Sequence, residues 1–263
     1  EGQSLVFWAA TCEGPVRIIM EDQESIFFLP DNLIPRAENI LKGVVSWRHQ
    51  LIKLKDFQGT PVHACYFRNQ RDLNVARSKL LAKQIVALEA DVRPTDRFLM
   101  ERFINGALSI SGTSIQEGVD SPTGVRAYQS FLDPHLAPVN FTPTLKIASL
   151  DIETSYSENV LYSIAVAGQG FQAVFMIGDD IAGQPEYLEF LVDERALIRR
   201  FLSWFADVDP DVIIGWSVVA FDLQFLEQRC QALNIDFRLG RGGETVRWRT
   251  NQQRQDRNYA LVP

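Results

Sequence analysis

An apolar strand that ends in two acids is the feature that most constrains the fold. The run Leu145–Ile152 predicts a β-strand, and the acids of Asp151-Ile152-Glu153 stand at its end. Successive side chains of a strand point to opposite faces, so Asp151 and Glu153 share one face. Two carboxylates at this spacing repel each other unless a cation lies between them. The pattern predicts an oxygen-ligand site for Mg²⁺ or Mn²⁺, with a solvated turn as the plainer alternative.

A third acid, Asp222, lies in the first turn of a helix predicted over residues 219–233. Phe225 and Leu226 follow at helical spacing, so Asp222 points along an apolar face, where an unpaired carboxylate is costly. The plainer alternative is that an acid in the first turn complements the helix dipole. Because a short turn joins this helix to the run Val212–Ile214, we expect Asp222 to approach the end of a neighbouring strand.

Together these acids favour phosphodiester hydrolysis with two metal ions. Such sites use about four acidic ligands, and the sequence offers three good ones, Asp151, Glu153 and Asp222. A stand-alone nuclease would need a fourth ligand, for which the nearest candidates are Asp179, Asp180 and Glu227. The sequence has no GxSxG motif and no pattern of cysteine with histidine, so a serine or cysteine nucleophile has no support.

The second part of the chain has the element order β-β-β-α-β-α. The predicted strands are Leu145–Ile152, Leu161–Ala167, Ala173–Ile177 and a buried central strand Val212–Ile214, and the helices are Arg195–Phe205, with Asp193 as N-cap, and 219–233. This order is the one used by the ribonuclease-H-like nuclease fold. The order alone predicts a fold and not an activity.

The first part reads as short strands with interspersed helices. The predicted strands are Leu5–Thr11, Val16–Met20, Ser25–Leu29, Val62–Phe67 and Ile85–Glu89, and the predicted helices are Pro35–Leu41, Arg71–Gln84 and Arg97–Ile104. The composition shifts to Gly, Ser, Pro and Asn from Gly112 to Pro143. We therefore expect a mixed α/β (α+β) chain with domains at residues 1–142 and 143–263.

Charge and cysteine content narrow the class of protein. The net charge of −7 argues against bulk electrostatic binding of DNA, although seven arginines against three acids between Arg229 and Arg257 predict a local basic edge. Three separated cysteines predict a reducing compartment, and three scattered histidines predict no zinc site. The sequence shows no membrane span and no signal peptide. Since it does not begin with Met, we expect it to start inside a longer gene product.

Several segments resemble family B DNA polymerases, in particular the bacterial polymerase II type. Ser149–Thr154 looks like the first exonuclease motif of the family, and Asp209–Asp222, with its long lead-in, looks like the second. Val62–Phe67, Leu88–Pro94 and Arg97–Phe103 look like the amino-terminal domain. The resemblance covers most of the chain. It implies an amino-terminal domain followed by part of a 3′→5′ proofreading exonuclease domain.

By this resemblance the three acids would ligate two Mg²⁺ or Mn²⁺ ions, and a single-stranded 3′ end would be held by stacking and backbone contacts. The residues that would contact the strand are Thr154, Trp216, Ser217 and Phe221. The implied partners are primer-template DNA, the remaining polymerase domains and, through a C-terminus of the parent enzyme, a sliding clamp. The implied location is the bacterial cytoplasm, at the nucleoid.

The sequence departs from the family pattern in two places. Ser217 stands where the family usually has Asn, and its shorter side chain weakens a contact to the strand. The third exonuclease motif, which supplies a water-orienting tyrosine and a fourth carboxylate, is missing, and Tyr259 does not replace it. We therefore expect this chain by itself to hold one ion or none and to be inactive.

A different class of function is a binding module without catalysis. In that hypothesis the amino-terminal half contacts single-stranded nucleic acid or a protein, and the nuclease-like half is a scaffold. Phe7, Trp8 and Phe27 on short strands are candidates for a stacking platform. Core packing is the plainer role for such aromatic residues.

Overall fold

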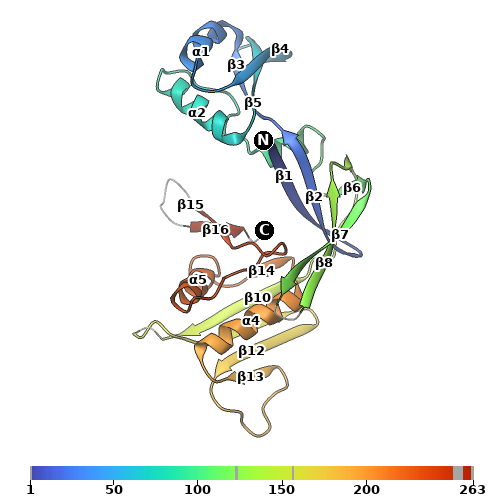
Figure 1. Cartoon of the computed structure of the whole chain (residues 1–263), viewed down its shortest axis with the longest axis vertical. Coiled ribbons are helices and arrows are strands. Elements are labelled where there is room, and N and C mark those ends of the chain that lie inside the picture. Colours follow the sequence, from blue (N-terminus) through green and yellow to red (C-terminus); the bar gives the residue numbers. More distant parts are fainter. Residues whose placement is uncertain (1, 122–123, 156, 251–256, 262–263) are drawn as a thin grey trace. The chain divides into compact units, whose positions relative to one another are not determined.

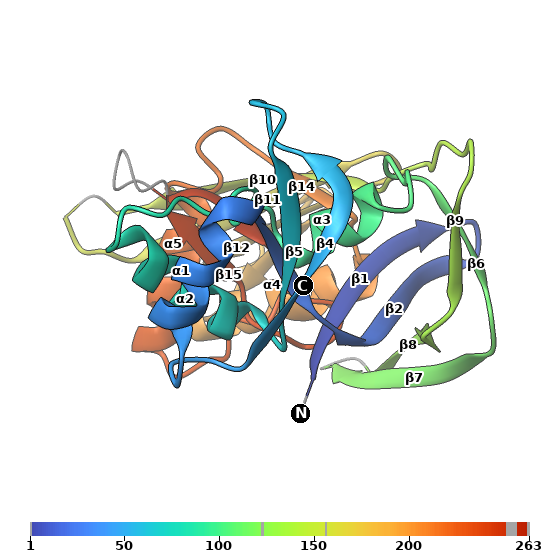
Figure 2. The ribbon, with the colours of Figure 1, turned by 90° about the horizontal axis from the view of Figure 1, so that it is seen from above.

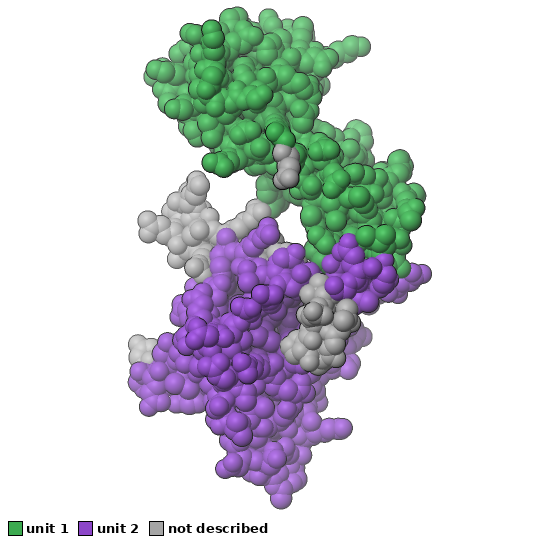
Figure 3. Space-filling view, in the orientation of Figure 1, with its two compact units in different colours: residues 1–9, 15–115, 129–142 green, residues 10–14, 116–128, 143–263 purple. Residues whose placement is uncertain are grey.

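The computed structural model describes residues 2–121, 124–155, 157–250 and 257–261. It divides into two compact units (Figure 3). Unit 1 contains residues 1–9, 15–115 and 129–142, and unit 2 contains residues 10–14, 116–128 and 143–263. Within the described ranges, no helix combines the length and apolar character needed to cross a membrane.

Unit 1 contains a three-stranded antiparallel sheet in the order β3–β5–β4. Its strands are β3 (Ser25–Pro30), β4 (Trp47–Lys55) and β5 (Pro61–Phe67), and the helices η1 (Asp31–Leu33), α1 (Ile34–Leu41) and α2 (Gln70–Leu81) accompany it (Figure 1). The apolar faces of these elements form one core around Phe27, Phe67, Leu73 and Leu80. Asn69 begins α2 by accepting the backbone N–H of Asp72 at 2.9 Å.

A second sheet has the strand order β1–β2–β8–β7. Its strands are β1 (Gln3–Thr11), β2 (Gly14–Gln23), β7 (Ser114–Ser121) and β8 (Gly124–Leu132), and Figure 2 shows β1 and β2 side by side. Unit 1 also contains the helix α3 (Pro94–Met100) and an antiparallel pair, β6 (Leu108–Ser111) with β9 (His135–Pro138). Leu5, Ile18 and Phe98 are buried in a small core there.

Unit 2 is built on a five-stranded mixed sheet in the order β13–β12–β11–β10–β14. Its strands are β10 (Ile147–Thr154), β11 (Leu161–Gly168), β12 (Phe171–Ile177), β13 (Leu188–Leu191) and β14 (Val212–Ile214). β10, β11 and β12 pair antiparallel in turn, whereas β14 pairs parallel with β10 and β13 pairs parallel with β12. Unit 2 also holds α4 (Glu194–Val208), α5 (Asp222–Ala232) and the antiparallel pair β15 (Arg247–Thr250) and β16 (Arg257–Leu261).

Helix α4 covers β11, β12 and β13 because its apolar residues fall on one stripe (Figure 1). Leu197, Ile198, Phe201 and Phe205 are all buried in the core of unit 2. The expected N-cap is confirmed, since Asp193 accepts the backbone N–H of Ala196 at 2.7 Å. The expectation of a mixed α/β fold is also confirmed, and β13 is an additional strand that the sequence analysis missed.

Some local expectations were wrong. Ile85–Glu89 is not a strand, and only Leu88 bridges to Phe28 there. The expected helix Arg97–Ile104 begins earlier, at Pro94, and ends at Met100. β14 is an edge strand of the described sheet and half-exposed, although its apolar run predicted a buried central strand. A run of three β-branched residues indicates a strand but does not determine how many neighbours it has.

Candidate metal and nucleic-acid site

The strand β10 presents two acids on one face, as its alternation predicted. Ala148, Leu150 and Ile152 are buried in the core, whereas Asp151 and Glu153 are exposed. The neighbouring strand places Ala165 opposite Asp151 and Ser163 opposite Glu153. These cross-strand partners are small, so they leave space around both carboxylates.

The edge strand β14 stops pairing with β10 just before the acids. The last pair in register is Ser149 with Ile214, and the chain then turns away at Gly215. A Cβ atom on Gly215 would lie 2.4 Å from the carbonyl oxygen of Leu150. Only glycine permits this approach, and it brings the turn after β14 against the backbone of β10.

The turn between β14 and α5 is held by its own backbone. The N–H of Phe221 donates to the carbonyl of Ser217 at 2.8 Å, and the N–H of Leu223 donates to that of Val218 at 2.9 Å. Ser217 has a φ of 57°, in the left-handed region. Trp216 is 91 % exposed and Phe221 is 47 % exposed, so the turn offers two aromatic rings to solvent next to the start of α5.

Asp222 is the first residue of α5 and is only 2 % exposed. Its Oδ2 atom is buried and has no hydrogen-bond partner. Burial raises the pKa of this carboxyl, and the negative charge of Asp151 raises it further, while hydrogen bonds from its own backbone amide and that of Ile152 lower it. The structure therefore brings Asp222 to Asp151, across the gap where β14 has ended.

The remaining acids are not gathered in the same way. Among the described residues, no three His, Cys, Asp or Glu side chains form a group arranged to hold a metal ion. Glu153 therefore does not complete such a group with Asp151 and Asp222, and neither do the candidate fourth ligands Asp179, Asp180 and Glu227. A pair of carboxylates still fits Mg²⁺, which uses one or two carboxylates and completes its shell with water and substrate phosphates. The orphaned oxygen of Asp222 supports that fit.

The lead-in to the second motif anchors the start of β10, a role the sequence analysis missed. Asp211 accepts the backbone N–H of Lys146 at 2.8 Å with one oxygen and the guanidinium of Arg241 at 2.6 Å with the other. Arg241 also donates to Asp209 at 2.8 Å, and these ion pairs raise its pKa against the effect of burial. Two acids flanking Pro210 were the available signal, but their arginine lies some thirty positions along the chain.

Helix α5 is tied to α4 by a partly buried ion pair. Both oxygens of Glu194 accept from Arg229, at 2.7 Å and 2.6 Å, and one also accepts the backbone N–H of Leu161 at 3.0 Å. The hydrogen bond to Glu194 raises the pKa of Arg229. Three of the seven arginines of the expected basic edge, Arg229, Arg238 and Arg241, form ion pairs within unit 2, so their charges are compensated there.

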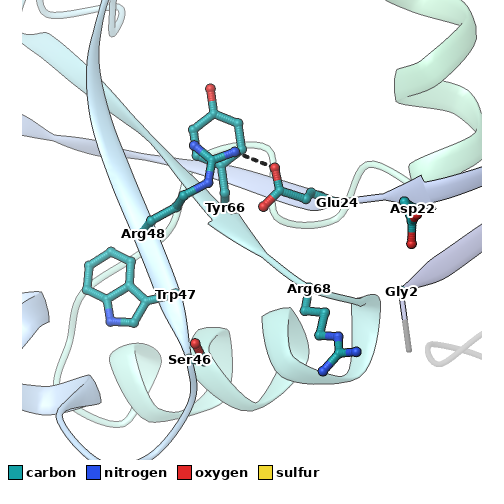
Figure 4. Close-up of a pocket in the computed structure, with 8 residues that line it drawn as sticks. All are labelled: Gly2, Asp22, Glu24, Ser46, Trp47, Arg48, Tyr66 and Arg68. Carbon is teal, nitrogen blue, oxygen red and sulfur yellow. Dashed lines mark hydrogen bonds and ion pairs between the residues drawn. The ribbon is translucent and has the colours of Figure 1, made fainter.

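Unit 1 contains an open cavity of about 330 Å³, lined by residues of β4 and β5 together with Gly2, Asp22 and Glu24 (Figure 4). Arg48 lies over the ring of Tyr66, 3.8 Å from its centroid, and forms an ion pair with Glu24. The cavity is lined by two arginines, two acids and two aromatic residues among others: Asp22, Glu24, Trp47, Arg48, Tyr66 and Arg68. Its formal charges cancel, so it does not attract a polyanion strongly.

The candidate aromatic platform of the amino-terminal half does not include Phe27. Phe27 is fully buried in the core of unit 1 and stacks near Phe67. Phe7 packs against Phe98 with ring centroids 5.6 Å apart. For Phe27 the stacking role is therefore wrong, because the residue faces the helices and not solvent.

Known proteins give the family of this chain. Residues 86–260 match the family model described as DNA polymerase family B, exonuclease domain, so the chain belongs to the family B DNA polymerases. DNA polymerase II of Escherichia coli (strain K12) is 37 % identical over 252 residues, which are 95 % of this chain and 31 % of that protein. The similarity to a bacterial DNA polymerase II expected from the motifs is thereby confirmed.

Two archaeal proteins extend the likeness. The DNA polymerase of Archaeoglobus fulgidus is 26 % identical over 250 residues, covering 89 % of this chain and 30 % of that protein. A structure of the family B DNA polymerase from Pyrobaculum calidifontis matches with a TM-score of 0.70 at 20 % identity, over 94 % of this chain and 34 % of that one. The chain thus spans about a third of the length of these relatives.

Proposed function

We propose that this chain supplies the amino-terminal domain, residues 1–142, and part of the 3′→5′ exonuclease domain, residues 143–263, of a DNA-directed DNA polymerase. Its substrate is a single-stranded 3′ end of DNA. The observation that carries the proposal is the buried Oδ2 of Asp222, which has no hydrogen-bond partner and lies near a second carboxylate, Asp151. An ionised carboxylate buried in that position is costly unless a cation compensates it.

Asp151, Asp222 and the exposed Glu153 would hold Mg²⁺ or Mn²⁺. The metal, when bound, supplies a water of lowered pKa and stabilises the leaving 3′ oxygen. The neighbouring turn supplies the strand contacts. The exposed ring of Trp216 and the half-exposed ring of Phe221 stack on bases, and Ser217 and Thr154 contact the backbone. These contacts orient the 3′ end without reading its sequence.

The chain of 263 residues by itself is expected to cleave DNA very slowly. By family resemblance, a water-orienting tyrosine and a fourth carboxylate belong to a third motif that this sequence does not contain. Loss of such groups costs several kcal/mol of transition-state stabilisation, and each ~1.4 kcal/mol is tenfold in rate. The remaining polymerase domains and a sliding clamp are the proposed partners in the bacterial cytoplasm.

The proposal is tested by Mn²⁺ binding, followed through the electron paramagnetic resonance of the free ion. The unchanged chain should bind Mn²⁺, and Asp222→Asn and Asp151→Asn should each weaken binding at least tenfold. Asp236→Asn, which alters an exposed acid of the same unit, is the matched control and should leave the affinity unchanged. Equal affinity in all four proteins would refute the metal site. Fast Mn²⁺-dependent cleavage of single-stranded DNA that Asp151→Ala abolishes would show that the third motif is dispensable.

A further inference from the structure

Two of the three histidines meet in unit 1, although they are scattered in the sequence. His49 on β4 pairs with Cys65 in the sheet, and His63 on β5 pairs with Leu51, so the two imidazoles are diagonal neighbours on one face. Their Nδ1 atoms are 3.0 Å apart, and their ring centroids are 5.0 Å apart. Neither residue belongs to the carboxylate site of unit 2.

The outer nitrogen of each ring is engaged by a carboxylate. His49 Nε2 is 3.1 Å from Glu38 on α1, and His63 Nε2 is 2.8 Å from Asp31 on η1. An ionised carboxylate only accepts hydrogen bonds, so each Nε2 carries the proton and donates it. In the neutral rings this leaves both Nδ1 atoms with a bare lone pair. Two lone pairs that face each other at 3.0 Å repel, and a cation bound by both nitrogens removes the repulsion.

We propose that His49 and His63 bind a divalent transition metal ion through their Nδ1 atoms. Metal–imidazole bonds of about 2.0–2.1 Å place two adjacent nitrogen ligands roughly 3.0–3.4 Å apart, which includes the distance in this structure. Metal-bound histidines almost always donate their other N–H to a carboxylate or carbonyl, and both rings do so here. The pair therefore has the inner nitrogens and the outer carboxylates of a histidine metal site.

The ligand set also defines which ion is bound. In the described residues no third His, Cys, Asp or Glu completes a metal-binding group, and Cys65 opposite His49 is fully buried in the core. Water must supply the other ligands, and the side chains are open enough for it, with exposures of 25 % for His49 and 13 % for His63. Two imidazoles with open positions favour Cu²⁺, followed by Ni²⁺ and Zn²⁺. The bound ion would link the β4–β5 hairpin to η1 and α1.

The test titrates the 263-residue protein with Cu²⁺ and follows the nitrogen hyperfine pattern by electron paramagnetic resonance. Cys12→Ser in every sample removes the exposed thiol, and excess Mg²⁺ occupies the carboxylates of unit 2. One Cu²⁺ with two imidazole nitrogens is expected. His49→Gln should lower the affinity at least tenfold and leave one nitrogen. His135→Gln, the third histidine, on β9, is the control and should change nothing.

Glu38→Gln tests the outer shell without touching a ligand. Glu38 is 57 % exposed, so this change leaves the fold intact, and loss of the outer carboxylate should weaken Cu²⁺ binding about 10–100-fold. The melting temperature gives a second measurement, because Cu²⁺ should raise it in the unchanged protein and not in His49→Gln. If the unchanged protein takes up no more Cu²⁺ than a His49→Gln/His63→Asn double variant, the pair is only an imidazole–imidazole hydrogen bond and the proposal is overturned.

Discussion

Helix α5 holds one buried and one partly buried charged group, at opposite ends of its inward face, but only one of the two is compensated within the chain. Arg229, in the last turn, is 16 % exposed and donates to both oxygens of Glu194. Asp222, in the first turn, is 2 % exposed, and the like charge of Asp151 acts on it. The same helix thus carries a satisfied ion pair and an unsatisfied pair of acids.

This difference separates a structural interaction from a functional one. A buried charge is tolerated when a partner of opposite sign satisfies it, and removal of that partner is strongly destabilising. A buried, ionised acid beside a second acid lowers the stability of the empty protein, and a cation from outside offsets this cost without protonating the acid. Substitutions at the two ends of α5 should therefore have opposite effects on stability.

The largest effect is expected from Arg229→Leu. The change removes the donor for both oxygens of Glu194 and leaves a partly buried carboxylate with only the Leu161 N–H. The free energy of unfolding should fall by about 3 kcal/mol, measured by urea unfolding followed through tryptophan fluorescence. Arg238→Leu breaks an exposed pair with Asp236 and should change stability by less than about 0.5 kcal/mol. Equal losses of stability in both variants would show that the Arg229–Glu194 pair stabilises the fold no more than the exposed Arg238–Asp236 pair does.

Gly215→Ala is expected to move Asp222 away from Asp151 and to leave the ion pair of Arg229 with Glu194 intact. The added Cβ would lie 2.4 Å from the Leu150 carbonyl oxygen, so the turn must move away from β10. Stability should fall by about 2 kcal/mol, and Mn²⁺ affinity should fall because Asp222 moves from Asp151. Gly112→Ala, where the nearest contact is 3.3 Å, is a milder control that should keep Mn²⁺ affinity. If Gly215→Ala bound Mn²⁺ as tightly as the unchanged chain, the turn at Gly215 would not be needed for the metal site.

Asp222→Asn should stabilise the metal-free protein by about 1 kcal/mol at neutral pH, because it removes a buried carboxylate with an unsatisfied oxygen. The pKa of Asp222 is raised in the folded state, so its protonated form favours folding below the unfolded pKa. That contribution is lost as pH rises through the folded pKa. The stability gap between variant and unchanged protein should therefore widen with rising pH, as measured by urea unfolding between pH 4 and 7.

Addition of Mn²⁺ should reverse the order of stability, so that the unchanged chain becomes more stable than Asp222→Asn. The ion stabilises only the protein that binds it, by an amount set by its concentration relative to the dissociation constant. The unchanged chain should then gain more stability than Asp222→Asn. If Asp222→Asn were less stable than the unchanged chain without metal at every pH, the acid would be a structural residue like Glu194.

The sequence was sufficient for the elements that carry the site, because its local patterns are strong there. Alternation predicted the shared face of Asp151 and Glu153, and the N-cap Asp193 marked the start of α4. The same local reasoning placed Asp222 in the first turn of α5. Each of these features depends on residues that are close in sequence, so a single short segment is enough to predict it.

Interactions between distant segments were not predictable in this way. Nothing local pairs Asp211 with Arg241, or His49 with His63, because strand pairing and loop closure bring them together. The edge position of β14 also depends on the whole sheet and not on its apolar run. Ser217 shows the same limit, since its left-handed backbone is visible only in the folded turn.

Ser217→Asn is expected to have the smallest effect on stability, and it tests the turn that precedes Asp222. The φ of 57° at Ser217 lies in a region where Asn is several-fold enriched over other residues with a side chain. The family preference for Asn at this position therefore has a backbone explanation in addition to a contact with DNA. We expect Ser217→Asn to raise the free energy of unfolding by about 0.5 kcal/mol without metal or DNA.

Two further variants distinguish the backbone from the side chain in this prediction. Ser217→Gly also relieves the left-handed conformation and should be tolerated, whereas Ser217→Ala keeps the strain and should give no gain. A gain with Asn and none with Ala, in urea unfolding of the free protein, would assign the effect to the turn itself. If Asn changes only the affinity for single-stranded DNA and not stability, the preference for Asn is explained by a contact with the strand. The conformation of the turn before Asp222 would then not depend on this side chain.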